Sequence, residues 1–295
     1  MILRTCAKVN IGLNILRKRP DGYHDIETLF VPYRGFGDVL TVEPADALSI
    51  DILREGSVGW DPMTDLTVRA WRLLKADFPS LPAVAIKLEK HAPVGAGLGG
   101  GSADAAFMLR ALNELGGLGL DDAELAAYAA RLGSDCAFFI GSSPMKKFPA
   151  IPLHPQGTGG GPPDTPCVAF APYVRPMFAT GRGEILEPFD INLSGYELRV
   201  DIPVDRATGQ PVAVSTKEAY GGIVPNESRQ ATLREALRLP VEKWRGVVVN
   251  DFEATVCPQH PEIPAAIEDF YRRGAVYAAM SGSGSAVFGL FPKEK

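Results

Sequence analysis

The chain has 295 residues, a formal net charge of −5, and a composition that is 46% hydrophobic and 22% charged. A length above the usual size of one hydrophobic core predicts two domains. Lysine and arginine are spread along the chain, and no apolar run approaches the roughly 18 residues of a membrane helix. We therefore expect neither a nucleic-acid nor a membrane partner.

The ends, cysteines and histidines of the chain carry little information about its chemistry. The first ten residues do not resemble a signal peptide. The four cysteines and four histidines are scattered, with no Cys-x-x-Cys pair, so neither a zinc site nor a disulfide framework is expected. This pattern fits a protein of the reducing cytoplasm.

The segment "CAKVNIGLNIL" near the N-terminus has the alternating pattern of a half-buried strand. Its apolar positions are Val9, Ile11, Leu13 and Ile15. Lys8, Asn10 and Asn14 share the opposite face. By itself this pattern makes Lys8 an exposed strand lysine, as most lysines are.

The rest of the first half predicts a mixture of strands and helices. The residues "PDGYH" form a turn signal, and strands are expected at 38–44, 47–53 and 83–90. Helical spacing appears from residue 64, then from Ser102 as N-cap to the glycines at 116 and 117, and then from the capping box of Asp121 and Glu124 to Gly133.

The second half begins with a segment without regular periodicity. Residues 142–176 contain nine prolines and are predicted to be mostly loop. A strand follows near residue 196, with helices near 215–221, 228–238 and 261–273. Two apolar runs joined by the Gly-Ser turn at 281–285 close the chain. The mixture predicts an α+β protein.

The stretch "PVGAGLGGGSADAA" at 93–106 is the most distinctive of the sequence. Gly95, Gly97 and Gly100 match a dinucleotide fingerprint, but no strand ends directly before them. A Walker loop would require lysine where Gly101 stands. A flexible linker would not lead straight into an amphipathic helix. The remaining interpretation is a phosphate-binding loop in front of a helix N-terminus.

Phosphoryl transfer also needs positive charge for the transition state and a group that orients the acceptor hydroxyl. Lys8 is a candidate for the first role and Asp135 for the second. Asp135 follows a helix-ending glycine, so it could equally be a helix N-cap. The order of the motifs along the chain favours the functional roles.

That order, "AKVNIGLNI", "PDGYHDIETLF", "PVGAGLGGGSADAA", "GSDCAFF" and "SGSGSAVF", resembles the GHMP kinase superfamily over nearly the whole chain. The resemblance implies an α+β, two-domain fold. An ATP-binding domain like domain 2 of ribosomal protein S5 would span 1–187, including the proline-rich insertion near 142–176. A ferredoxin-like C-terminal domain would span 188–295.

The glycine loop together with "DGYH" resembles members that phosphorylate a hydroxyl of a cytidylated methylerythritol in the non-mevalonate isoprenoid route. The resemblance implies ATP and Mg²⁺ as cofactors, with Lys8 and Asp135 as the catalytic pair. The implied ATP site consists of Pro93, Gly95, Gly97, Leu98, Gly99, Gly100, Gly101, Ser102 and Ala103, with Asp65 and Leu66 bordering the adenine. Ser102 is also the one expected protein contact of Mg²⁺.

The implied substrate site joins Asn10, which would hold hydroxyls, to a cytosine site. Tyr23 and Tyr220 resemble the aromatic pair that sandwiches the cytosine, and His24 would read the edge of the base. Tyr220 would otherwise be an ordinary helix residue behind a capping box of Ser215 and Glu218.

Three other functions are alternatives. The protein could be another GHMP kinase, acting on homoserine, mevalonate or a sugar, although "DGYH" disfavours this. It could also be a non-catalytic ATP-binding regulator, although the presence of both Lys8 and Asp135 disfavours that. A nicotinamide-dependent oxidoreductase is the third alternative. The roughly 30 residues inserted between Ile140 and Pro176 depart from the family pattern and have no assigned role.

Overall fold

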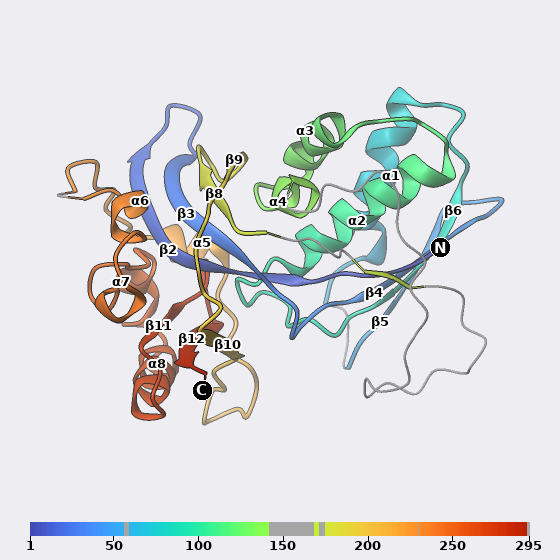
Figure 1. The fold of residues 1–295 in the computed structure, drawn as a ribbon. Coiled ribbons are helices and arrows are strands. Elements are labelled where there is room, and N and C mark those ends of the chain that lie inside the picture. The colour runs from blue at the N-terminus through green and yellow to red at the C-terminus, as the bar shows by residue number, and fades with distance from the viewer. Residues whose placement is uncertain (56–58, 142–167, 171–174, 230, 294–295) are drawn as a thin grey trace. The chain divides into compact units, whose positions relative to one another are not determined.

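The computed structural model describes residues 1–55, 59–141, 168–170, 175–229 and 231–293 (Figure 1). The chain forms two compact units built from interleaved segments. Unit 1 contains 1–7, 36–92 and 100–174, and unit 2 contains 8–35, 93–99 and 175–295. The predicted domains, 1–187 and 188–295, are consecutive parts of the sequence, whereas each unit is built from several segments. The predicted domain boundary therefore stays a prediction. No helix among the described residues is long and apolar enough to cross a membrane.

Unit 1 is a five-stranded sheet with helices on one face (Figure 1). The sheet order is β5-β6-β4-β1-β7, in which β1 and β7 are parallel, β5 and β6 are parallel, and the other pairs are antiparallel. The strands are β1 (Ile2–Arg4), β4 (Val39–Pro44), β5 (Ser49–Leu53), β6 (Val84–Glu89) and β7 (Val168–Phe170). The predicted loop at 142–176 thus contains one strand, and most of its remainder lies outside the described residues.

The helices of unit 1 begin where the sequence supplies capping side chains. They are η1 (Pro62–Thr64), α1 (Leu66–Asp77), α2 (Gly100–Leu115), α3 (Asp122–Leu132) and α4 (Cys136–Gly141). Asp65 caps α1, and the predicted capping box of Asp121 and Glu124 on α3 is confirmed. The prediction that Ser102 caps α2 is wrong, because the helix already begins at Gly100.

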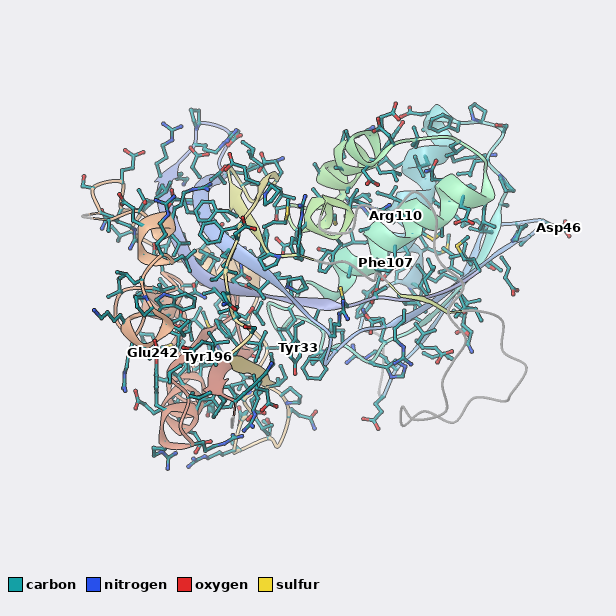
Figure 2. All side chains as sticks on the ribbon, viewed as in Figure 1. Tyr33, Asp46, Phe107, Arg110, Tyr196 and Glu242 are labelled. Carbon is teal, nitrogen blue, oxygen red and sulfur yellow. The ribbon has the colours of Figure 1, made fainter. Side chains whose placement is uncertain are left out.

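A buried arginine ties three of these helices together (Figure 2). Arg110, on α2, is 6% exposed. Its guanidinium donates to the carbonyl oxygen of Ile140 at 2.8 Å and pairs with Asp122 at 3.0 Å. Burial lowers the pKa of Arg110, and the charge of Asp122 opposes that effect. These contacts hold the α4 segment that follows Asp135 against α2.

Unit 2 contains two sheets (Figure 1). The first, in order β2-β3-β8-β9, comprises β2 (Ala7–Lys18), β3 (His24–Tyr33), β8 (Met177–Thr180) and β9 (Ile185–Pro188). The second, in order β10-β12-β11, comprises β10 (Tyr196–Asp201), β11 (Tyr277–Met280) and β12 (Val287–Pro292) and is antiparallel. The predicted turn between the last two apolar runs is confirmed.

The helices of unit 2 are α5 (Thr216–Tyr220), α6 (Leu233–Ala236), η2 (Val241–Lys243), α7 (Glu253–Val256) and α8 (Glu262–Arg272). The three helices predicted in unit 2 correspond to α5, α6 and α8, of which α6 is much shorter than predicted, and η2 and α7 were not predicted. Ser215 caps α5, but Glu218 pairs with His260 at 2.6 Å, so the second half of the predicted capping box is not seen. Tyr196 at the start of β10 donates a hydrogen bond to Glu242 in η2 (Figure 2).

Strand β2 differs from the half-buried strand that the alternating pattern predicts. Both of its faces are buried from Ala7 to Ile15. Lys8 and Asn10 are each 2% exposed, and Asn14 is 4% exposed. An exposed strand lysine is therefore excluded as the interpretation of Lys8. A buried ammonium needs polar partners, because removing the charge from water is costly.

Candidate functional site

Lys8 lies in a hydrogen-bonded cluster within unit 2. Its Nζ donates to the carbonyl oxygen of Gly97 at 2.9 Å and to Oδ1 of Asn10 at 2.5 Å. The Nδ2 of Asn10 donates to Thr28 Oγ1 at 2.9 Å, and that hydroxyl donates to the carbonyl oxygen of Gly12 at 2.6 Å. The structure thus brings together Lys8, Asn10 and Gly97, which sequence reasoning assigned to catalysis, substrate and ATP.

The loop at 281–285 completes this cluster. Ser281 is fully buried, and its Oγ accepts from the amide of Asn10 and donates to the carbonyl oxygen of Gly97, both at 3.2 Å. A Cβ added to Gly97, whose φ is +74°, would overlap the carbonyl oxygen of Ser281. Sequence reasoning identified 281–285 as a turn but did not assign Ser281 to the site.

In the first part of the glycine loop, the carbonyl groups and the amide groups differ in their hydrogen bonding to the rest of the described protein. Gly95, Gly97 and Gly99 all have φ between +71° and +74°. The carbonyl oxygens of Ala96, Gly97 and Leu98 accept hydrogen bonds within unit 2. Across the described part of the chain, the amides of residues 95 to 99 donate to no protein acceptor. Such unpaired amides in alternating glycine conformations suit an anion.

The second part of the loop opens α2 in unit 1. The first four amides of a helix have no partner within the helix, and the helix dipole favours negative charge there. A side-chain hydrogen bond joins Ser102 in the first turn to Cys136, and burial raises the pKa of that thiol to about 12. Asp135 directly precedes Cys136 and accepts a hydrogen bond from Ser134 at 3.4 Å. Unit 1 therefore gathers Ser102 and Asp135 around the start of α2.

The predicted residues beside the adenine lie at the same end of α2. Asp65 accepts hydrogen bonds from the amide and the hydroxyl of Thr67, at 2.9 and 2.7 Å. A Cβ on Gly101 would lie 3.8 Å from the side chain of Leu66. The structure thus brings Leu66 to the glycine loop, while Asp65 serves as the cap of α1.

A buried ion cluster, which sequence reasoning missed, lies beside the same helix start. Lys90 pairs with Asp38 and, at 2.7 Å, with Asp104. Asp38 also accepts from the amides of His91 and Ala92 at 2.6 and 2.7 Å. Burial raises the pKa of Asp104 to about 8, although Lys90 opposes the rise. The sequence signal was an Asp inside an otherwise apolar helix face.

The predicted substrate residues fall into two groups. His24 stacks on Tyr220 with ring centroids 4.7 Å apart, and Tyr220 meets Phe252 edge-on at 4.8 Å. Tyr23 is 56% exposed, and the guanidinium of Arg182 lies 4.8 Å from its ring. The structure thus brings His24, rather than Tyr23, against Tyr220. Burial, with a smaller effect of Lys18, lowers the pKa of His24.

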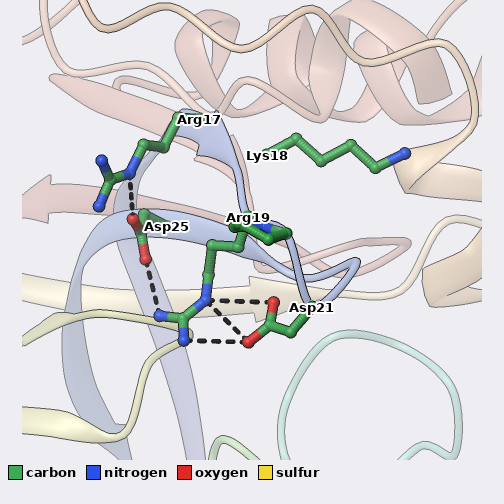
Figure 3. Close-up of a pocket in the computed structure, with 6 residues that line it drawn as sticks. Arg17, Lys18, Arg19, Asp21 and Asp25 are labelled. Atoms are coloured by element: carbon green, nitrogen blue, oxygen red, sulfur yellow. Dashed lines mark hydrogen bonds and ion pairs between the residues drawn. The ribbon is translucent and has the colours of Figure 1, made fainter.

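Ion pairs hold the β2–β3 turn that carries His24 (Figure 3). Arg17 and Arg19 bind Asp25 at 2.5 and 3.0 Å, and Arg19 also binds Asp21 at 3.0 Å. These residues line a pocket together with Lys18 and Pro20. Hydrogen bonds from the arginines lower the pKa of Asp21 and of Asp25. Charged side chains therefore link the two ends of this turn.

Known proteins resemble this chain over its full length. The family model of the GHMP kinases N terminal domain matches residues 65–143, and that of the GHMP kinases C terminal region matches residues 227–295. A 4-diphosphocytidyl-2-C-methyl-D-erythritol kinase of Bacteroides fragilis is 42% identical over 100% of this chain and 94% of its own length. The chain belongs to the GHMP kinase family. Membership makes it an ATP-dependent small-molecule kinase.

Further GHMP kinases support the same relationship. The equally named enzyme of Bacteroides thetaiotaomicron is 40% identical over 100% of this chain and 93% of its own. A crystal structure of 4-(cytidine 5'-diphospho)-2C-methyl-D-erythritol kinase has a TM-score of 0.66 at 30% identity, covering 98% of this chain and 90% of its own. A homoserine kinase from Cytophaga hutchinsonii, at 16% identity and a TM-score of 0.60 over 99% of this chain and 86% of its own, shares the fold. The predicted GHMP kinase fold is confirmed.

Proposed function

We propose that this GHMP kinase transfers the γ-phosphoryl group of ATP to a hydroxyl of 4-diphosphocytidyl-2-C-methyl-D-erythritol. The observation that carries the proposal is the full-length likeness to curated relatives of that name, five of which are 37–42% identical to this chain. The substrate combines a cytosine, a diphosphate and a polyol. His24 beside Tyr220 offers an aromatic and hydrogen-bonding surface for the base.

We propose that the nucleotide phosphates lie on the glycine loop. The unpaired amides of residues 95–99 and the start of α2 would bind them, with Ser102 and Ala103 in the first helical turn. Pro93, Gly100 and Gly101 complete the proposed loop, and Asp65 and Leu66 border the adenine. The contact between Leu66 and Gly101 supports this placement.

Mg²⁺ would be held mainly by the nucleotide phosphates. Among the described residues, no group of three or more His, Cys, Asp or Glu side chains could hold a metal ion. Mg²⁺ commonly keeps several waters and shares substrate phosphates with few protein ligands. The hydroxyl of Ser102 fits as one such ligand. The bound ion would neutralise the charge that develops on the transferring phosphoryl group.

Lys8 and Asp135 belong to different units, and their joint action is part of the proposal. The Lys8 ammonium, held by Gly97 and Asn10, would stabilise negative charge on the transferring group. Asp135 would orient the acceptor hydroxyl and take its proton late in the transfer. A carboxylate is a weak base for an alcohol, so orientation of the hydroxyl is its main contribution.

Release of ADP in the presence of different acceptors tests the proposal. We expect turnover with the cytidylated methylerythritol and little with homoserine or mevalonate at the same concentrations. Asp135→Asn should lower kcat for the accepted substrate while the protein remains folded. Faster turnover of homoserine or mevalonate would reassign the protein to another member of the family.

A further inference from the structure

We propose that Asn250 is a positioning residue that sets the place of the Lys8 ammonium through the loop at 281–285. Asn250 is 2% exposed, and it belongs neither to the glycine loop nor to the predicted substrate residues. The inference rests on the proposed function, in which Lys8 serves the transfer. Its support lies entirely within unit 2.

The carboxamide of Asn250 is fully engaged. Its Nδ2 donates to the carbonyl oxygens of Met280 and Gly282, each at 2.8 Å. Its Oδ1 accepts from the amide of Phe252 at 3.1 Å. The two accepting carbonyls flank Ser281, so one side chain fixes the backbone on both sides of that residue. A carboxylate of the same shape would have no N–H to donate.

The backbone of Asn250 is in turn fixed on the strand that carries Lys8. The amide of Leu13 on β2 donates to Val249 O, and the amide of Asp251 donates to Leu13 O, both at 2.9 Å. An Asp251 carboxylate oxygen accepts from the amide of Ile15 at 2.7 Å. Asn250 thus links β2 directly to the loop at 281–285.

The held loop contacts the ammonium and its partners. Ser281 bonds to Asn10 and Gly97, which are the two residues that accept from Lys8 Nζ. A Cβ on Gly282 would lie 3.0 Å from Gly97 O, 3.1 Å from Asn10 Oδ1 and 3.3 Å from Lys8 Nζ. Displacement of this loop would therefore move the acceptors that hold the ammonium.

Glu253 supports the same loop from the start of α7. Its Oε1 accepts from the amide of Met280 at 2.8 Å, and its own amide donates to Asn250 O at 2.9 Å. The carbonyl and the amide of Met280 are thus both bound by the short segment at 250–253. Two independent hydrogen bonds at one residue leave the loop little freedom relative to β2.

The experiment compares Asn250→Asp with Asn113→Asp. Asn113 is a matched control, because its carboxamide also bridges backbone groups, donating to Leu120 O at 2.9 Å and accepting from Leu120 N at 3.0 Å, but in unit 1. Asn250→Asp should lower kcat about tenfold or more and change both KM values much less. Asn113→Asp should affect stability alone.

A double-mutant cycle with Lys8→Met separates positioning from a general loss of structure. If Asn250 acts through Lys8, adding Asn250→Asp to Lys8→Met should change the residual kcat by no more than about twofold. Full additivity of the two losses would overturn the inference.

A second readout needs no substrate. Trace labelling with acetic anhydride, followed by mass spectrometry, reports the accessibility of individual lysines. Labelling of Lys8 should rise about fivefold or more in Asn250→Asp and stay unchanged in Asn113→Asp, with buried Lys90 as internal standard. Unchanged Lys8 labelling in folded Asn250→Asp would overturn the inference. Absence of turnover in the wild type would instead overturn the proposed function. The labelling of Lys8 would then still decide whether Asn250 sets the place of the ammonium.

Should Asn250→Asp fail to fold, Gly282→Ala provides the same test. It leaves the carboxamide of Asn250 intact but introduces a methyl group against Gly97 O and Lys8 Nζ. We expect the same loss of kcat and the same rise in Lys8 labelling. A folded Gly282→Ala protein with wild-type values for both would contradict the inference.

Discussion

The ammonium of Lys8 donates a hydrogen bond of 2.9 Å to the carbonyl oxygen of Gly97, 89 residues further along the chain. This bond joins the first long strand to the glycine loop inside unit 2. The loop carbonyls are thereby occupied by the protein, which leaves its amides for an anion. The Lys8 ammonium and the loop that is proposed to bind phosphate are thus joined within unit 2.

Replacement of Lys8 should impair the chemical step more than binding. Lys8→Met should lower kcat by about 100-fold or more, with smaller changes in KM, because the ammonium is proposed to stabilise charge that develops in the transition state. Steady-state kinetics with ATP and the cytidylated substrate measure the effect. Lys87→Met, at an exposed lysine of β6 that pairs with Glu89, is the control and should keep wild-type kinetics. Equal kcat values in the two variants would contradict the role.

Gly97→Ala should be more harmful than Gly117→Ala. Both glycines have positive φ, +74° and +58°, so each alanine is strained by about 1 kcal/mol. Nothing lies within 4 Å of a Cβ at Gly117, whereas a Cβ at Gly97 overlaps the carbonyl oxygen of Ser281. Urea unfolding should show an additional loss of about 1–3 kcal/mol for Gly97→Ala. Equal losses of unfolding free energy in the two variants would show that the protein accommodates the overlap with the carbonyl oxygen of Ser281 without loss of stability.

Lys90→Met should destabilise the protein by about 3–5 kcal/mol, because it removes the cation that pairs with the buried side chains of Asp38 and Asp104. The free energy of unfolding, measured by denaturant titration at pH 7, gives the value. The exposed Lys87→Met variant should change it by less than about 0.5 kcal/mol. A loss for Lys90→Met as small as that of the control would mean that the cluster contributes little.

Glu253 makes stability depend on pH. Burial raises the pKa of its carboxyl from 4.5 to about 7, with the Met280 amide opposing the rise. The folded state thus retains a proton that the unfolded state loses as pH rises above 4.5. The contribution of this carboxyl to the free energy of unfolding is fully present below pH 4.5. It is lost as pH rises through 7, by roughly 3 kcal/mol in total.

Glu253→Gln keeps an oxygen acceptor for the Met280 amide but cannot ionise. The free energy of unfolding of this variant, minus that of the wild type, should be larger at pH 8 than at pH 5. Denaturant titrations of both proteins at the two pH values measure this difference. A stability difference between the two proteins that is the same at both pH values would contradict the buried, protonated state of Glu253.

If His24 contacts the substrate as proposed, binding of the cytidylated substrate should depend on pH. Its pKa is lowered from 6.5, by burial first and by Lys18 second, so the imidazole is neutral at pH 7. The KM of the cytidylated substrate should be constant above pH 7 and should change only as the pH falls below 6.5, where the ring gains its proton. His24→Gln should remove that dependence. A wild-type KM profile with its inflection above pH 7 would contradict a lowered pKa.

Periodicity and capping predicted much of the fold. Most of the predicted strands and helices, the capping box at Asp121 and the final hairpin all appear in the structure. Strand β3 was missed, because its polar residues lie mostly in its first half and its apolar run follows them, so no regular alternation marks the segment after the turn signal "PDGYH". The start of α2 was misplaced by two residues, because Ser102 is a better N-cap by residue type than the glycines that actually begin the helix.

The site could be predicted only in part. Lys8, Asn10 and Gly97 were expected to serve the reaction, and their mutual contact could not be read from local periodicity because it links residues 89 positions apart. The burial of Lys8 contradicted the local pattern. Asn250 and Ser281 were not assigned, because a single Asn after three valines and a Ser in a turn carry no local signal of long-range hydrogen bonds.

Transfer of labelled γ-phosphoryl from ATP to 4-diphosphocytidyl-2-C-methyl-D-erythritol, measured for the wild type and for Lys8→Met, tests the proposed function most directly. We expect label in the phosphorylated cytidylated product with the wild type and about 100-fold slower transfer with Lys8→Met. Absence of label in that product with the wild-type protein, at saturating ATP and Mg²⁺, would contradict the proposed function.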